Sequence, residues 1–375
     1  MTTKVTRRGL VLGSAAAAGA MALGGPRAFA QDAVKVGFVY VGPIGDFGWT
    51  HGHELGREAV VEHFGDQVET SYVENVAEGP DAERVIRQLA ASGHGLIFTT
   101  SFGYMNPTIR VAQQFPDVKF EHATGFQTAP NVSAYNARFH EGRSVCGAIA
   151  GHHTTTGIVG YIASFPIPEV VMGINAFTLA AQKEVVMGIN AFTLAAQKVR
   201  PDIQIKVVWV NSWYDPGKEG DAAKVLIDQS ADIICQHTDS PAPLQTAETR
   251  GVHGFGQASD MSAYAPNAQL TSILDDWSGY YLQRTQDVID GTWESQNIWW
   301  GIKEGMVKMA PWGDAVSAEA RAAAEATRDG IVAGTLHPFT GPIKNQAGEV
   351  VIADGETMGD ADLLQMDWYV QGVDA

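Results

Sequence analysis

The chain has 375 residues and a formal net charge of −17 at pH 7, because 42 acidic side chains outnumber 25 basic ones. An acidic balance of this size argues against binding to nucleic acid or to an anionic membrane surface, since both are negatively charged themselves. The length is sufficient for two domains of ordinary size.

Residues 1–30 have the pattern of a secretion signal. The run TRRGL at 6–10 is similar to the twin-arginine export signal; an alanine-rich apolar stretch follows, and Ala28-Phe29-Ala30 supplies a cleavage motif. The apolar stretch is short and interrupted by glycine, and no cysteine follows the motif to carry a lipid. We therefore expect a soluble periplasmic monomer without a lipid anchor, beginning near Gln31. Because the signal holds four basic and no acidic residues, the mature charge would be −21.

The first predicted element is a strand that leads through a glycine-rich loop into a helix. β-branched and aromatic residues over 34–39 suit a buried strand, Gly42-Pro43-Ile44-Gly45 ends it, and Asp46 or Thr50 can cap the helix. The loop has neither of the glycine patterns that hold nucleotide phosphates. Its Trp49, flanked by small and hydrogen-bonding residues, suits a flat polar ligand, and the alternative is that this ring folds into the core.

Strands and helices then alternate through two runs, with a restart near residue 155. The further strands are expected at 67–72, 95–99, 117–123, 132–135, 157–163, 203–210, 233–236, 252–256 and 270–274. The helices between and after them are expected at 81–91, 141–152, 218–229, 242–249 and 278–290. Repeated alternation predicts parallel sheets with helices on both faces. The fold class is therefore α/β, with two doubly wound, Rossmann-like lobes and a ligand cleft between them.

The lobes are expected to share the chain unevenly. We assign residues 31–154 and about 268–300 to the N-terminal lobe, and residues 155–267 and about 301–375 to the C-terminal lobe. Crossing strands near 153–157, 265–270 and 300–310 would form the hinge. In the tail, the residue pattern predicts a strand pair at 297–300 and 305–310, a helix at 317–333 and a hairpin around 345–352.

One segment is duplicated. Residues 169–183, EVVMGINAFTLAAQK, recur without change at 184–198. The second copy can extend one helix with its apolar stripe rotated by roughly 60°, since each residue advances about 100°, or it can loop out. A repeat architecture needs several longer units, so we interpret the duplication as a recent tandem event or an error in the recorded sequence.

The export signal, the two-lobe alternation and three segments together resemble the basic membrane protein family of ABC transporter substrate-binding proteins, which includes purine nucleoside receptors. The segments are HTDSPAPLQTAETRGVHGFGQASD at 237–260, WWGIKEGMVKMAP at 299–311 and GTLHPFTGPI at 334–343. The resemblance implies a type I periplasmic binding protein fold with a hinge of crossing strands. It also implies a small-molecule ligand, no cofactor, and an ABC permease in the inner membrane as partner.

In this family, one aromatic residue in the first loop and another in the second lobe stack on the two faces of a purine. The resemblance places Trp49 in the first position. It places Trp213, in the run VVWVNSWYD at 207–215, in the second; the alternative for Trp213 is a core residue at a strand end. Hydrogen bonds to the edge of the ring are expected from Asp46, Thr50, His53, Ser101, Thr124, Asp239 and Asp260.

Two departures from the family concern the ribose. Nucleoside-binding members hold it with an aspartate in a G-x-D-x-D-like segment and a lysine after the next strand. Here Ala258 stands at the first aspartate, Asp260 is retained, and Asp275 stands where lysine is expected. We therefore expect a free nucleobase such as adenine to be preferred, with a purine nucleoside or another polar solute such as a sugar as alternatives.

Catalysis is disfavoured by the motifs. His51-Gly52-His53 is weak as a metal site without a third ligand, and the chain has no HExxH, CxxC or GxSxG pattern. We therefore predict neither an enzyme nor a metal site. Cys146 and Cys235 lie in apolar surroundings, which favours buried free thiols, although an oxidising compartment also permits a disulfide.

Overall fold

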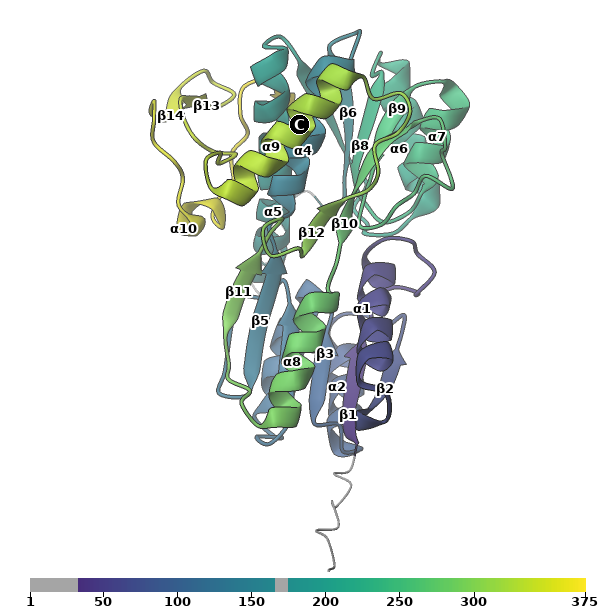
Figure 1. Cartoon of the computed structure of the whole chain (residues 1–375), viewed down its shortest axis with the longest axis vertical. Coiled ribbons are helices and arrows are strands. Elements are labelled where there is room, and N and C mark those ends of the chain that lie inside the picture. The colour runs from purple at the N-terminus through teal and green to yellow at the C-terminus, as the bar shows by residue number, and fades with distance from the viewer. Residues whose placement is uncertain (1–32, 166–174) are drawn as a thin grey trace, which may run out of the picture. The chain divides into compact units, whose positions relative to one another are not determined.

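The computed structural model describes residues 33–165 and 175–375, and within these residues two sheets form two α/β lobes (Figure 1). The first sheet has six parallel strands in the order β11-β5-β4-β3-β1-β2. These strands are β1 (Val34–Val39), β2 (Val68–Val73), β3 (Leu96–Thr99), β4 (Lys119–Ala123), β5 (Val132–Ala137) and β11 (Asn297–Trp300). The predicted α/β class with parallel sheets is confirmed.

Helices cover both faces of the first sheet. They are α1 (Trp49–Phe64), α2 (Pro80–Ala91), α3 (Met105–Ala112) and α8 (Ser278–Asp290), with short 3-10 turns η1 (Gly65–Gln67) and η2 (Phe102–Tyr104). Successive side chains of a strand point to opposite faces. Accordingly, Phe38 packs in one core with Tyr281 of α8, and Val39 packs in another with Ile86 of α2.

The second sheet has seven strands in the order β12-β10-β9-β8-β6-β7-β15, and all its pairs are parallel except β10 with β12. The strands are β6 (Ile158–Ala163), β7 (Gln204–Trp209), β8 (Ile233–His237), β9 (His253–Gly256), β10 (Gln269–Asp275), β12 (Val307–Met309) and β15 (Val373–Asp374). One face carries α6 (Pro216–Asp228) and α7 (Ala242–Arg250), and the other carries α4 (Phe139–His153), α5 (Asn175–Val199) and α9 (Ala318–Ala333). The remaining elements are α10 (Asp360–Leu363) and the small hairpin of β13 (Ile343–Lys344) and β14 (Val350–Ile352).

The chain passes between the sheets at three places: from β5 to α4, from β10 to α8, and from β11 to β12. The first two differ from the boundaries expected near residues 154 and 268. α4 packs on α5 and α9 of the second lobe, and β10 pairs with β9 and β12 there, so the passages lie at about 138 and 276. The third passage falls within the expected 300–310.

The predicted strand pair in the tail is wrong. β11 pairs with β5 of the first sheet, and β12 pairs with β10 of the second. The two strands follow one another in sequence but lie on opposite sides of a passage between lobes, so their adjacency does not make a hairpin. The predicted hairpin around 345–352 is confirmed as β13 and β14.

The duplicated segment contributes one continuous helix over its described part. α5 runs from the first copy into the second, and the second copy buries Val185, Ile189 and Phe192 in the core. Its close neighbour is α4, where a Cβ atom added at Gly151 would lie 2.7 Å from the backbone oxygen of Ala196. Residues 169–174, like the predicted signal at 1–30, lie outside the described residues.

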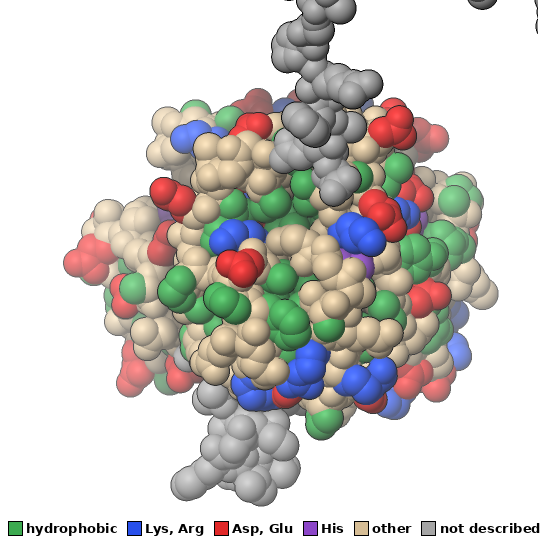
Figure 2. All heavy atoms as spheres, turned by 90° about the horizontal axis from the view of Figure 1, so that it is seen from below, with side chains coloured by type: hydrophobic (Ala, Val, Ile, Leu, Met, Phe, Trp, Pro, Cys, Tyr) green, Lys and Arg blue, Asp and Glu red, His purple; other side chains and the backbone are tan. Residues whose placement is uncertain are grey.

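The amino ends of the first-lobe strands form the face seen in Figure 2. Its described residues show positive and negative side chains mixed with apolar ones, without a continuous field of one sign. In the described part of the chain, no helix combines the length and apolar character needed to cross a membrane.

Candidate functional site

A cavity lies between the carboxyl ends of the two sets of strands. Every residue lining it follows or ends a strand: Val41 and Trp49 after β1, Ser101 and Phe102 after β3, Thr124 after β4, Phe139 after β5, Trp213 after β7, His237 and Asp239 at the end of β8, and Gln257 after β9. Ligands of doubly wound sheets bind at this edge. The empty space, including the part open to solvent, is about 620 Å³, within the range of small-molecule pockets.

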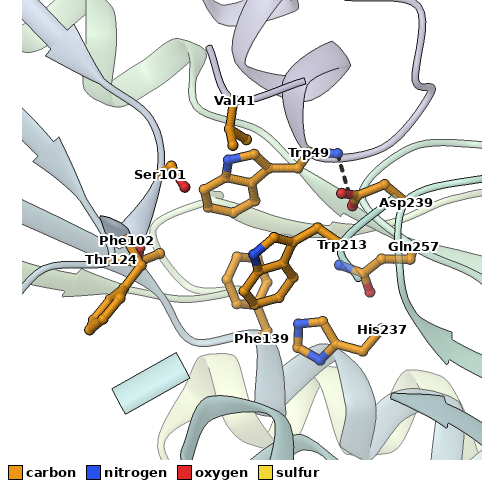
Figure 3. A pocket seen from close by; sticks show the side chains of 10 residues that line it. All are labelled: Val41, Trp49, Ser101, Phe102, Thr124, Phe139, Trp213, His237, Asp239 and Gln257. Carbon is orange, nitrogen blue, oxygen red and sulfur yellow. Dashed lines mark hydrogen bonds between the residues drawn. The ribbon is translucent and has the colours of Figure 1, made fainter. Parts of the chain in front are cut away.

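Aromatic rings form the main walls of the cavity. Figure 3 shows the indoles of Trp49 and Trp213 entering it from the two lobes, with Phe139 beside them. Trp49 is held from behind, because its Nε1 donates to the backbone oxygen of Thr100 at 2.6 Å and its ring meets His53 edge to face at 4.5 Å. Trp213 packs against Phe165 at 5.0 Å. Both rings therefore have protein neighbours outside the lining of the cavity.

Asp239 joins the two lobes at the rim of the cavity. Its Oδ1 accepts from the backbone N–H of Trp49 at 3.2 Å, and its own N–H donates to the backbone oxygen of Trp213 at 3.0 Å. Burial raises the pKa of Asp239 well above its usual range, and the nearby carboxylates Asp46 and Glu219 raise it further. Burial therefore favours the neutral form of this carboxyl, which can donate one hydrogen bond and accept another.

His237 stays neutral in the second-lobe wall. Burial lowers its pKa well below the usual range, and the Arg143 guanidinium lowers it further. Its buried Nδ1 has no hydrogen-bond partner in the described part of the chain. A neutral imidazole presents one donor and one acceptor.

A second polar group of this wall is fixed from behind. The Oε1 of Gln257 accepts a hydrogen bond from Nη2 of Arg143, whose side chain is fully buried. The same guanidinium donates to Sγ of Cys235 at 3.3 Å and lies over the ring of Tyr161.

The cavity is bordered by strained backbone. Phe47, Thr124, Asn211 and Ala258 all have positive φ, between 54° and 63°, and each follows a strand of the two sheets. This conformation is costly for residues other than glycine, above all for β-branched Thr124. Such strain concentrates where a fold positions a ligand.

Five of the nine side chains predicted for the site line the cavity: Trp49, Ser101, Thr124, Trp213 and Asp239. The other four do not. Asp46 accepts the backbone N–H groups of Gly48, Thr50 and His51 at 2.9, 3.1 and 3.0 Å, so it caps the start of α1.

The remaining three of those four side chains have other neighbours. Thr50 accepts from the backbone N–H of Gly42 at 3.2 Å. His53 is buried behind Trp49, where its Nδ1 lies 2.6 Å from the Tyr281 hydroxyl. Exposed Asp260 accepts from the side chain of Gln269 at 2.8 Å.

Sequence reasoning missed Val41, Phe102, Phe139, His237 and Gln257. Their shared signal is position, since each lies at or shortly after the end of a predicted strand. Phe139 also begins α4, where the chain first passes between the lobes. That passage was expected some fifteen residues later in the sequence. In the described residues, no group of three or more His, Cys, Asp and Glu side chains is arranged to hold a metal ion.

Comparisons with known proteins agree with this architecture. The profile of the PnrA-like ABC transporter substrate-binding protein family matches residues 33–335. A purine-binding protein of Brucella abortus is 56% identical over 350 residues, which cover 93% of this chain and 95% of that protein. A Haloferax volcanii protein, provisionally named as an ABC transporter glucose-binding protein, is 37% identical over 83% of this chain and 75% of its own length.

Among solved structures, an ABC transporter solute-binding protein from Aeropyrum pernix has a TM-score of 0.68, covering 88% of this chain and 95% of that one. At 17% identity this likeness shows the fold alone. The family profile spans both lobes as far as α9 and includes every residue that lines the cavity. This chain therefore belongs to the PnrA-like family of ABC transporter substrate-binding proteins.

Proposed function

We propose that this protein is the periplasmic receptor of an ABC importer, and that it captures a purine, preferably a free nucleobase such as adenine, for delivery to an inner-membrane permease. One observation carries the proposal: Trp49 and Trp213 enter the same cavity from opposite lobes (Figure 3). A flat heterocycle between two indoles gains about 0.5–1.5 kcal/mol per stacked pair beyond its buried area. The Brucella relative, named as a purine-binding protein, supports the same class of ligand.

Asp239 adds a buried carboxyl at the edge of the cavity. Burial raises its pKa well above the usual range, and a carboxyl can hydrogen-bond to a ring nitrogen when protonated or to a ring N–H when ionised. A ligand without such an edge would leave buried polar groups unpaired, and that discriminates against it.

Preference for a base over a nucleoside rests on Ala258 and Asp275. Asp275 stands where nucleoside-binding relatives are expected to have lysine, and it is a buried carboxyl whose pKa is raised to about 8 by burial, although Arg143 lowers it. It cannot supply the cationic donors of a lysine to ribose hydroxyls. Ala258 has no polar side chain to replace the missing aspartate.

Capture proceeds by closure of the lobes about the three passages. Contacts between the lobes border the cavity: Ser259 Oγ donates to the backbone oxygen of Phe47, and the Phe47 ring meets Tyr264 at 4.9 Å. A ligand that contacts both lobes stabilises this arrangement relative to a separated one. The permease would then distinguish loaded from empty receptor, and no catalytic step is involved.

The first test identifies the ligand directly. Small molecules released by denaturing the purified protein are analysed by mass spectrometry, and binding is then titrated calorimetrically with adenine, hypoxanthine, adenosine and glucose. We expect a purine base, with binding lost in Trp49→Ala and Trp213→Ala and kept in Trp312→Ala, which removes a partly buried indole outside the cavity. Equal affinity for adenine and adenosine would refute the base preference, and no purine binding by folded protein would refute the function.

A sugar receptor is the second candidate, because the Haloferax relative is named for glucose. Sugar sites pair their many hydroxyls with several carboxylate, amide or guanidinium groups. The side chains that line this cavity include one carboxyl and one carboxamide. Tight glucose binding in the titration would favour this candidate over the purine.

We also propose that residues 1–30 direct export and are removed. N-terminal sequencing of the protein from the periplasmic fraction should give a start near Gln31. Replacing both Arg7 and Arg8 by lysine should block export if the twin-arginine route is used, and continued export would refute that route.

A further inference from the structure

We propose that Gln257, oriented by Arg143, is a hydrogen-bond donor that fixes which edge of the ligand faces the second lobe. The ligand presents an acceptor, such as a ring nitrogen with a free lone pair, to Gln257, and its donor groups face Ser101 and Thr124 of the first lobe. This inference rests on the proposed purine function and assigns an orientation within it.

The orientation of the Gln257 carboxamide follows from its partner. A carboxamide has one accepting and one donating end, whereas a guanidinium can only donate. Arg143 donates to Gln257, so the accepting oxygen must face away from the cavity toward Arg143. The amide nitrogen is then left for the cavity, and Figure 3 shows it on the cavity side of the side chain.

The surroundings of Arg143 favour its hydrogen bond to Gln257. Its side chain is fully buried, and none of the ion pairs among the described residues includes it. Gln257 is the oxygen acceptor that it reaches, and the other contacts are a sulfur atom and an aromatic ring. Rotating the carboxamide by half a turn would place two donors face to face and leave a buried charge unpaired.

The opposite wall has the reverse polarity. Ser101 donates its hydroxyl proton to Oε1 of Glu78 at 2.5 Å, and that same oxygen accepts the backbone N–H of Gly103 at 3.1 Å. Thr124 donates its hydroxyl proton to the backbone oxygen of Ala123 at 2.7 Å. Both hydroxyl oxygens therefore have lone pairs, but no proton, to offer a ligand.

The two walls together define a polarity for the bound ring. Adenine fits, because the two hydrogens of its amino group can face the accepting hydroxyls while one ring nitrogen accepts from Gln257. A ring turned in its own plane so that N–H groups face Gln257 would put donor against donor. Such a mismatch weakens binding by about tenfold to a hundredfold.

The test couples one ligand atom to one side chain. Adenine and its 1-deaza, 3-deaza and 7-deaza analogues, each with one ring nitrogen replaced by C–H, are titrated against wild type, Gln257→Met and Gln257→Glu. Methionine keeps the volume of glutamine without the donor, and glutamate turns an acceptor to the cavity while still pairing with Arg143. Exposed Gln113, substituted in the same two ways, is the matched control.

We expect one deaza analogue to bind wild type about tenfold more weakly than adenine, and this loss to disappear in Gln257→Met. Gln257→Glu should bind adenine more weakly than Gln257→Met does. Arg143→Lys, which keeps a donor to Gln257, should retain the coupling, whereas Arg143→Met should lose it at unchanged fold by circular dichroism.

Other results overturn the proposal in separable ways. Purine binding without coupling between any ring nitrogen and Gln257 overturns the orientation and leaves the proposed function standing. Failure of folded wild type to bind any purine overturns the function and the orientation with it. Unchanged adenine affinity in Gln257→Glu overturns the assignment of Gln257 as a donor.

Discussion

Replacing Gly48 by alanine should weaken ligand binding by obstructing closure rather than by removing a contact to the ligand. Gly48 belongs to the first-lobe loop before α1 and faces Asp239 of the second lobe. A Cβ atom added there would lie 2.6 Å from the Cα atom and 2.7 Å from the backbone oxygen of Asp239. Backbone atoms cannot swing aside, so the lobes themselves must move apart.

The size of the effect follows from this overlap. Apolar atoms in ordinary contact lie about 4 Å apart, so relief requires a separation of about 1 Å at the rim of the cavity. Overpacking by a single methyl group costs about 1–3 kcal/mol, which corresponds to a loss of affinity of about fivefold to 150-fold. The φ of Gly48 is −117°, so the substitution introduces no left-handed strain. Any loss of helix capping acts on open and closed forms alike.

The assay is calorimetric titration with the ligand, together with small-angle X-ray scattering to follow closure and thermal unfolding without ligand. Gly45→Ala is the control, because it lies in the same loop and an added Cβ atom there meets nothing within 4 Å. If Gly48→Ala binds and closes as Gly45→Ala does, the lobes do not approach at this point in the bound protein, and the reasoning fails.

Three further predictions concern other contacts. Ser259→Ala removes the bond between lobes to Phe47, so calorimetry should show about fivefold weaker binding, whereas exposed Ser262→Ala should not. Burial raises the pKa of Asp275 in the folded protein from 3.8 to about 8, so the unfolded chain releases that proton first and the wild type loses stability as pH rises between these values. In urea unfolding, Asp275→Asn should not show this loss of stability. If the free energy of unfolding depends on pH equally in both proteins, the Asp275 carboxyl is not buried in this way. Arg284→Met removes the cationic partner of the fully buried Glu121 and should lower the free energy of unfolding in urea by about 3–5 kcal/mol; a smaller loss would indicate that water reaches Glu121.

The sequence was most informative where function and local structure coincide. Strand patterns predicted the parallel α/β lobes, and the family resemblance, confirmed by the profile match, directed attention to Trp49 and Trp213. Both residues lie in or at the end of the segment that links a strand to the next helix, so their place at the cavity edge is a consequence of chain order. Local patterns of this kind survive into the folded structure because a parallel sheet brings all its carboxyl ends together.

What sequence reasoning missed depends on partners distant in the chain. The function proposed for Gln257 comes from Arg143, 114 residues earlier, and no local pattern links the two. Asp46 was expected at the ring edge, but the amides at the start of α1 take up its oxygens. The misplaced pairing of β11 and β12 has the same origin, since only the sheets decide which neighbour a short strand meets.

The passages between the sheets also determine when each lobe can be completed during synthesis. β11 completes the first sheet and α8 packs on α1, but β11 and α8 both come after the strands β6 to β10 of the second lobe in the chain. The second sheet in turn receives its edge strand β15 from the last residues. A nascent chain that ends before about residue 300 therefore exposes one side of β5, and one that ends before α8 also exposes the apolar face of α1. Stable folding must wait until nearly the whole chain has left the ribosome, so truncated products should be aggregation-prone rather than independently folded lobes.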